Sequence, residues 1–195
     1  APPAGGARPH LTSGLKSLAM TWTAPAVDRP SGPNVAGERE AAEGLLEYHR
    51  ATLLSKCAGL TGDQLATRAV PPSTMSLLGL VRHLTDVERV WFRRRVAGDQ
   101  IDAVYWSDAT ANGDFDDIDP ARVEADFAAY RAEVDAARVV LAARDYDDTF
   151  LSRHGDGTEE TIDVRALVLH MTEEYARHNG HADLLRECID GETGD

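Results

Sequence analysis

Residues 164–189, VRALVLHMTEEYARHNGHADLLRECI, decide the fold that the sequence predicts. Apolar side chains recur there at intervals of three and four residues, which is the period of an α-helix with one buried face. Thr161, shortly before this run, is the expected helix N-cap. The apolar stripe consists of Val164, Leu167, Val168, Met171, Tyr175, Ala182, Leu185 and Ile189, and His178 lies in the same seam. The sequence therefore predicts one long helix that packs against other helices.

Three further segments have the same period, at about residues 37–58, 73–98 and 119–144. Ser73 or Ser76 is expected to cap the second of them, Pro120 suits the first turn of the third, and Thr61 would cap a short extra helix. The connections 99–119 and 145–160 are acidic and lack a helical period. Strand signals are few, and no Gly-rich phosphate loop occurs. We predict an all-α fold, a four-helix bundle of the up-down type with long loops.

Several histidines occupy positions on these helices where an apolar side chain would be expected. His170, Glu174 and His178 follow one another at four-residue steps, so they project from one side of the last helix. Two donors one turn apart can reach one ion at roughly 2.0–2.2 Å, and His83 on the second helix would complete a set of three with open positions for water or substrate. In the alternative interpretation, Glu174 pairs with Arg177 or His178 on the helix surface.

The composition excludes several classes of partner. The chain has 195 residues, 20 of them Lys or Arg and 33 Asp or Glu, and a formal net charge of −13. Such a surface repels nucleic acids and anionic membranes, and no apolar run is long enough to span a bilayer. Two cysteines, Cys57 and Cys188, do not make a disulfide framework, so we expect reduced thiols in a cytoplasmic protein.

The first part of the chain differs from the rest. Residues 1–19 are rich in Pro, Gly and small side chains and cannot bury enough apolar surface to fold. We expect residues 1–36 to form a disordered or extended tail, with a native start near Met20, and residues 37–190 to form the bundle.

Four segments carry a family resemblance: MTWTAP at 20–25, EYHRATLLSKCAGL at 47–60, VPPSTMSLLGLVRHLTDVERVWF at 70–92 and HMTEEYARHNGHADLLRE at 170–187. Together they resemble the DinB-like superfamily, and more narrowly its mycothiol-dependent branch. Members are four-helix bundles whose core holds a divalent metal, commonly through one His of the second helix and an HxxxH pair of the last. Carried over by position, the metal ligands are His83, Glu174 and His178. Glu174 replaces the first His of that pair, as in the similar His-Glu-His set of the family's mycothiol-dependent maleylpyruvate isomerases.

The resemblance implies an enzyme: a metal-dependent S-transferase or isomerase that uses a low-molecular-weight thiol of the mycothiol type on small electrophiles. Zinc is the first expectation for the metal, with nickel, manganese or iron as alternatives. Bundles of this family often dimerise, so a homodimer is expected. His49 and His170 are candidates to orient the metal ligands from outside, although ordinary core packing explains both equally well.

Two other functions fit the same residues. A metal hydrolase would activate water instead of a thiol, and a non-catalytic bundle would bind metal as a sensor or in a stress response. The two cysteines are expected to be packed or inert rather than nucleophilic. Arg93, Arg94 and Arg95 would bind acidic groups of a substrate or thiol or, in the simpler interpretation, offset a helix dipole.

Overall fold

The computed structural model describes residues 21–153 and 157–194. The expected disordered segment at residues 1–19 and the expected start at Met20 lie outside the described residues.

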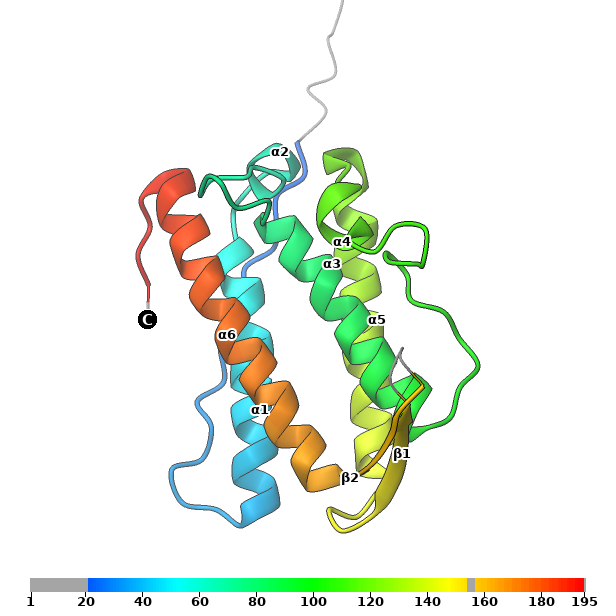
Figure 1. Cartoon of the computed structure of the whole chain (residues 1–195). Helices are drawn as coiled ribbons and strands as arrows, with labels where there is room; N and C mark the ends of the chain where they lie inside the picture. The colour runs from blue at the N-terminus through cyan, green and yellow to red at the C-terminus, as the bar shows by residue number, and fades with distance from the viewer. Residues whose placement is uncertain (1–20, 154–156, 195) are drawn as a thin grey trace, which may run out of the picture.

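Within these two ranges, four long helices dominate the structure. They are α1 (Glu38–Cys57), α3 (Leu77–Glu88), α5 (Val123–Ala142) and α6 (Val164–Asp190). The helices lie side by side in two pairs, with α1 packed along α6 and α3 packed along α5 (Figure 1). The described chain is therefore mostly helical, as the sequence predicts.

The second predicted helix reaches Val96, but its last part has a different geometry. After Glu88 the chain continues as a π-helix, η1 (Arg89–Val96), and Gly98 follows with a φ of 80°. Ser76 rather than Ser73 caps α3, because its hydroxyl accepts from the backbone N–H of Gly79 at 3.1 Å. Short π-helical turns are frequent at functional sites, and the sequence pattern does not distinguish them from α-helix.

Short elements occupy the connections. They are α2 (Gly62–Leu65), α4 (Gly113–Asp116) and the 3-10 helix η2 (Pro120–Arg122). Thr61 caps α2, as predicted, through a capping box with Gln64. Pro120 lies at the first turn of η2, ahead of α5.

The connection before α6 is not the irregular acidic loop that the sequence indicates. β1 (Thr149–Arg153) and β2 (Glu159–Asp163) pair as antiparallel strands, with Phe150 opposite Ile162. Phe150 packs against the core, which gives this short hairpin an apolar anchor. Thr161 lies within β2, and Asp163 is the N-cap of α6 instead, since its carboxylate accepts from the N–H of Ala166 at 2.7 Å.

The segment before α1 is extended and packs on the helices. The N–H of Ala24 donates to the carbonyl of Leu60 at 2.9 Å, and Ala24 is only 2% exposed. The ring of Trp22 meets Phe127 of α5 edge-on, with the centroids 5.3 Å apart. No helix in the described part of the chain is both long and apolar enough to cross a membrane.

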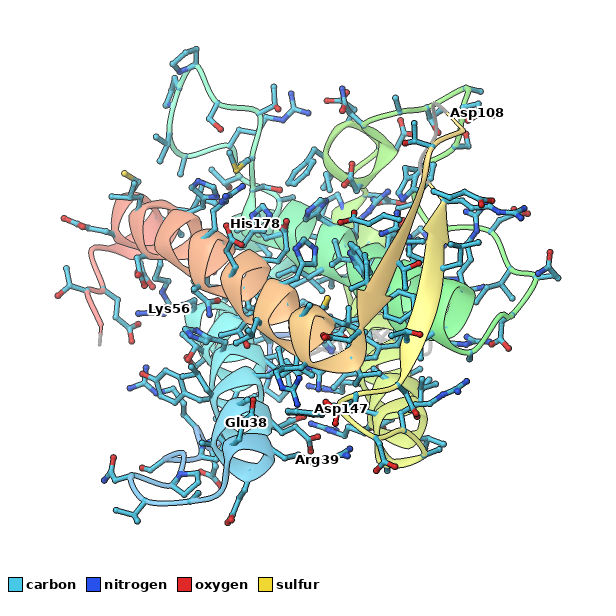
Figure 2. The ribbon with its side chains drawn as sticks, turned by 60° about the horizontal axis from the view of Figure 1, so that its bottom comes forward. Glu38, Arg39, Lys56, Asp108, Asp147 and His178 are labelled. Carbon is cyan, nitrogen blue, oxygen red and sulfur yellow. The ribbon has the colours of Figure 1, made fainter. Side chains whose placement is uncertain are left out.

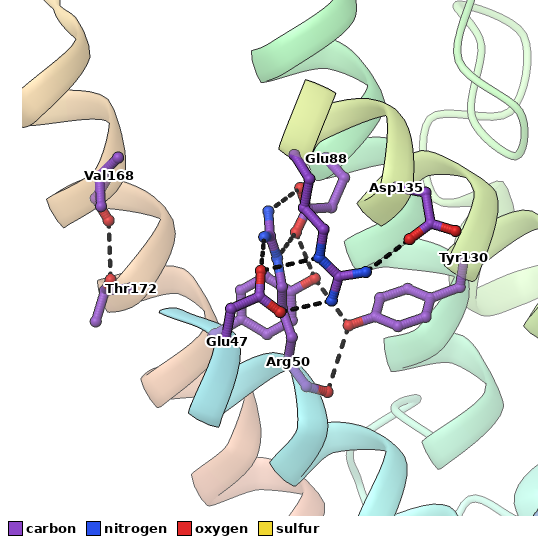
Figure 3. A network of polar contacts seen from close by, with 9 residues as sticks. Glu47, Arg50, Glu88, Tyr130, Asp135, Val168 and Thr172 are labelled. Atoms are coloured by element: carbon purple, nitrogen blue, oxygen red, sulfur yellow. Dashed lines mark hydrogen bonds and ion pairs between the residues drawn. The ribbon is translucent and has the colours of Figure 1, made fainter. Parts of the chain in front are cut away.

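A buried polar network joins all four long helices (Figure 3). Arg50 of α1 donates to both carboxylate oxygens of Glu88 of α3, at 2.8 and 2.7 Å. The hydroxyl of Tyr175 of α6 donates to Glu88 at 2.7 Å and lies 3.0 Å from the hydroxyl of Tyr130 of α5. Because a buried charge is costly without its partner, this network favours one arrangement of the four helices over others.

Candidate metal centre

The structure brings together the three residues that the sequence suggests as metal ligands. His83 comes from α3, and Glu174 and His178 come from one face of α6. One ligand atom from each lies within 4.8 Å of the others, and His178 Nε2 is 3.5 Å from Glu174 Oε2. The rings of His83 and His178 are 4.7 Å apart between centroids. Figure 2 shows His178 on the side of α6 that faces α3.

The surface interpretation of Glu174 accounts for only part of its surroundings. Arg177 pairs with Glu173 at 3.3 Å rather than with Glu174. Glu174 and His83 are each partly buried, and His178 is buried. The cluster is therefore a partly enclosed set of two imidazoles and one carboxylate.

The surroundings of His178 favour its neutral form. Its pKa is lowered to about 4, chiefly by burial, and the neighbouring imidazoles of His83 and His181 act in the same direction. Nδ1 of His181 lies 3.4 Å from Nδ1 of His178. A neutral imidazole keeps a lone pair on one ring nitrogen, which is the form that binds metals.

An aspartate that sequence reasoning missed fixes the orientation of His83. Asp114 of α4 is buried, and its Oδ2 lies 2.8 Å from His83 Nδ1. The ring therefore donates from Nδ1 and leaves Nε2 free. Carboxylates commonly orient ligating imidazoles in this way. The only sequence signal was the acidic character of the loop 99–119, which does not single out one aspartate.

The connection that carries Asp114 is held to α3 at further points. Arg82 donates to the carbonyls of Gly113 and Asp117, at 2.8 and 2.5 Å. One turn further on, the carboxylate of Asp86 accepts three backbone N–H groups, those of residues 104, 105 and 106, at 2.5–3.3 Å. One helix therefore positions both His83 and the loop that orients it.

The two histidines considered as outer partners lie beside other groups. The ring of His170 lies against that of Trp91, with the centroids 4.5 Å apart and the planes tilted by 56°. Asn179 donates from Nδ2 to the carbonyl of His49 at 3.0 Å and also approaches its Nδ1. Neither His170 nor His49 has a hydrogen bond to the three candidate ligands among the described side chains.

A pocket of about 330 Å³ opens beside His83. Its walls combine polar groups with Val87, Val90, Trp91, Trp106 and Phe115. A mostly apolar cavity with a few convergent polar groups is the usual form of a small-molecule site. The pocket would place a bound small molecule beside His83 and Asp114, whereas Glu174 and His178 are not among its lining residues.

The cysteines lie away from this centre. Cys57 is fully buried on α1, and burial raises its pKa to about 12, so its thiol is protonated at neutral pH. Cys188 is exposed near the end of α6. Neither belongs to the cluster or lines the pocket beside His83.

Fold and site together define a mostly helical protein with a His-Glu-His cluster between two helices, next to a pocket. The family model described as MST, mycothiol-S-transferase, matches residues 41–191, and the chain belongs to this family. The resemblance to the mycothiol-dependent branch of the DinB-like superfamily is confirmed. No curated protein matches the chain. Family membership makes the protein a thiol transferase with a thiol as one substrate.

Proposed function

We propose that the protein is a metal-dependent mycothiol S-transferase acting on small electrophiles, and that its four long helices form a DinB-like bundle. In this proposal His83, Glu174 and His178 hold one divalent cation, with zinc the first choice. The supporting observation is the convergence of these three donors, with Asp114 orienting one of them. A homodimer and a cytoplasmic location remain predictions from the sequence.

The donor atoms suit such an ion. Ligand bonds of roughly 2.0–2.2 Å in tetrahedral or octahedral geometry separate neighbouring ligand atoms by about 3.0–3.5 Å. His178 Nε2 and Glu174 Oε2 are 3.5 Å apart, and the whole set lies within 4.8 Å. Small rotations of the side chains therefore suffice to bind one ion. Two imidazoles and one carboxylate suit zinc, iron, manganese or nickel.

Each residue has a separate task in this proposal. Asp114 holds the ring of His83 so that Nε2 is free. The low pKa of His178 keeps its ring neutral over the physiological range. The apolar side chains beside His83 hold the electrophile and exclude water from the reacting atoms.

A bound divalent cation would lower the pKa of a thiol and favour the thiolate, which is the reactive form. In the transfer, the thiol sulfur forms a bond to an electrophilic carbon, and the leaving group departs with the electron pair of the bond that breaks. The thiol proton passes to solvent. No thiol of the protein is required, in agreement with the inert surroundings of Cys57.

Metal content tests the ligand set, and the chain offers a matched control. Glu174 and Glu173 are adjacent, but only Glu174 belongs to the cluster, whereas Glu173 pairs with Arg177 on the surface. We expect about one divalent ion per wild-type chain by elemental analysis of protein prepared without a histidine tag or chelator. Glu174→Gln and His178→Ala should lose most of this metal, and Glu173→Gln should keep it. Equal metal content in all four proteins would refute the ligand assignment.

Turnover tests the reaction. The metal-loaded protein should consume a small electrophile only when mycothiol is present, and Glu174→Gln should lose this activity while Glu173→Gln keeps it. Consumption at the same rate without thiol would indicate a hydrolase. Tight metal binding without either reaction would indicate a non-catalytic role.

A further inference from the structure

A second pocket of about 430 Å³ adjoins the one beside His83. The two share Val90 and Trp106 in their walls. The remaining lining of the second pocket consists of Arg94, Arg95, Gln100, Leu151 and Arg153, and we call this pocket the arginine groove. It lies where η1 meets β1, on the side of the molecule that carries the hairpin.

The arginine groove concentrates positive charge in a protein whose net charge is −13. Three arginines line it, and none of its lining residues within 21–153 and 157–194 is an Asp or Glu. Arg153 pairs with Glu159 at 2.6 Å. Within residues 21–153 and 157–194, however, Arg94 and Arg95 have no carboxylate partner. Their neighbouring cations repel each other, so an anion placed between them would be favoured.

Arg93, the residue before Arg94, differs from it because carboxylates neutralise its charge. Arg93 pairs with Asp99 at 3.1 Å and with Glu133 of α5 at 3.1 Å. Two carboxylates therefore hold Arg93 in place, and it needs no ligand to balance its charge. Arg94 and Arg95 differ because they line the groove, and neither pairs with a carboxylate in the described part of the chain.

An aromatic side chain connects the arginine groove to the pocket beside His83. The guanidinium of Arg95 lies over the ring of Trp91, 3.9 Å from its centroid. Trp91 in turn lines the pocket beside His83. Burial lowers the pKa of Arg95, and the neighbouring charge of Arg94 acts in the same direction. Trp91 thus holds Arg95 at the boundary between the two pockets.

We propose that the electrophile is an organic anion, whose flat apolar body occupies the pocket beside His83 and whose carboxylate lies between Arg94 and Arg95. This inference rests on the proposed function, because it assigns the electrophile to the same site. Trp91 and Trp106 provide apolar surfaces for the body of such a molecule. Guanidinium groups bind carboxylates through two parallel hydrogen bonds, which gives specificity for the anion.

A direct binding measurement separates this inference from the reaction. The probes are 3-nitrobenzoate and 3-nitrobenzamide, which are unreactive toward thiols and differ in charge, and the readout is titration calorimetry. We expect the benzoate to bind wild-type protein more tightly than the benzamide. Arg94→Gln and Arg95→Gln should each weaken benzoate binding about tenfold without changing benzamide binding. Arg131→Gln, an exposed arginine of α5 outside the groove, is the control and should change neither.

Turnover then identifies which reactant carries the anion. With 4-chloro-3-nitrobenzoate, the thiol sulfur bonds to the ring carbon that bears chlorine, chloride leaves with the bonding pair, and the thiol proton enters the buffer. Arg94→Gln should raise KM for this electrophile and leave KM for the thiol unchanged, and 4-chloro-3-nitrobenzamide should be unaffected.

Equal affinities for benzoate and benzamide, or unchanged benzoate binding in both variants, would overturn the inference. An increase in KM for the thiol alone would also overturn it, because the groove would then serve the thiol. Selective benzoate binding without any thiol-dependent turnover would support the anion site and refute the proposed function instead.

Discussion

Replacing Glu88 with Gln removes the charge at the centre of the buried network. Glu88 is 0% exposed and accepts two hydrogen bonds from Arg50 and one from Tyr175. In Glu88→Gln, the guanidinium of Arg50 stays buried, and Glu47, at 2.7 Å, is the one carboxylate partner left to it among the described residues. The amide that this substitution introduces can replace one acceptor but presents its NH₂ group to another donor.

The size of the effect follows from this loss of partners. Removing one member of a buried ion pair typically costs 3–5 kcal/mol, and the remaining contact of Arg50 with Glu47 places our expectation at about 3 kcal/mol. For a chain of this length, each kcal/mol shifts Tm by roughly 2–4 °C, so Tm should fall by about 6–12 °C.

Denaturant unfolding monitored by circular dichroism gives the free energy, and calorimetry gives Tm. Glu173→Gln is the matched control, because it removes an exposed acid and should change stability by less than about 0.5 kcal/mol. The double variant Arg50→Met/Glu88→Leu should recover much of the loss, since apolar side chains of similar volume often replace a buried ion pair at little cost. A change below about 0.5 kcal/mol in Glu88→Gln would show that the network contributes little to stability, and would refute this reasoning.

Three further predictions concern other parts of the molecule. Asp114→Asn should weaken metal affinity about 10–100-fold, because it disturbs the hydrogen bond that orients the ring of His83. The control Asp116→Asn, on the same short helix, should leave metal affinity unchanged. Equal zinc affinities of the two variants in a competition titration would contradict this. At pH 8, iodoacetamide should modify Cys188 and leave Cys57 unmodified in the folded protein, because burial raises the pKa of Cys57 to about 12; mass spectrometry distinguishes the two sites. Thr61→Ala should reduce the free energy of unfolding by about 1 kcal/mol through loss of the α2 cap, and an unchanged denaturation midpoint would exclude that role.

The sequence predicts features that depend on helical spacing. The four-residue step from Glu174 to His178 places both on one face whatever the tertiary structure, and the apolar period around His83 places it near the inner face of its helix. Spacing does not determine which helices are neighbours, so it offers His83 as the third ligand without fixing that these two faces meet, and the family resemblance adds support for it. The structure brings the three residues together.

Other features depend on contacts between distant segments, so local patterns do not reveal them. Asp114 is one aspartate among several in an acidic loop, and only the packing of α4 on α3 places it beside His83. Arg50 and Glu88 look like ordinary surface charges on amphipathic helices, yet they pair in the core. The hairpin strands are five residues each, too short for alternation to be a clear signal, and three of the five residues of β2 are acidic.

The attachment of the loop 99–119 to α3 affects how the enzyme would select its substrates. Arg82, His83 and Asp86 hold this loop within one turn of helix, through bonds to 113, 114, 117 and 104–106. Because this loop is already fixed in place, a ligand that binds beside it does not have to order the loop. Little binding free energy is therefore lost to conformational entropy. Such a cavity admits molecules that match its existing shape, and adapts poorly to larger ones. We therefore expect a narrow range of electrophile sizes, with variation in selectivity arising from substitutions in the pocket walls rather than from movement of this loop.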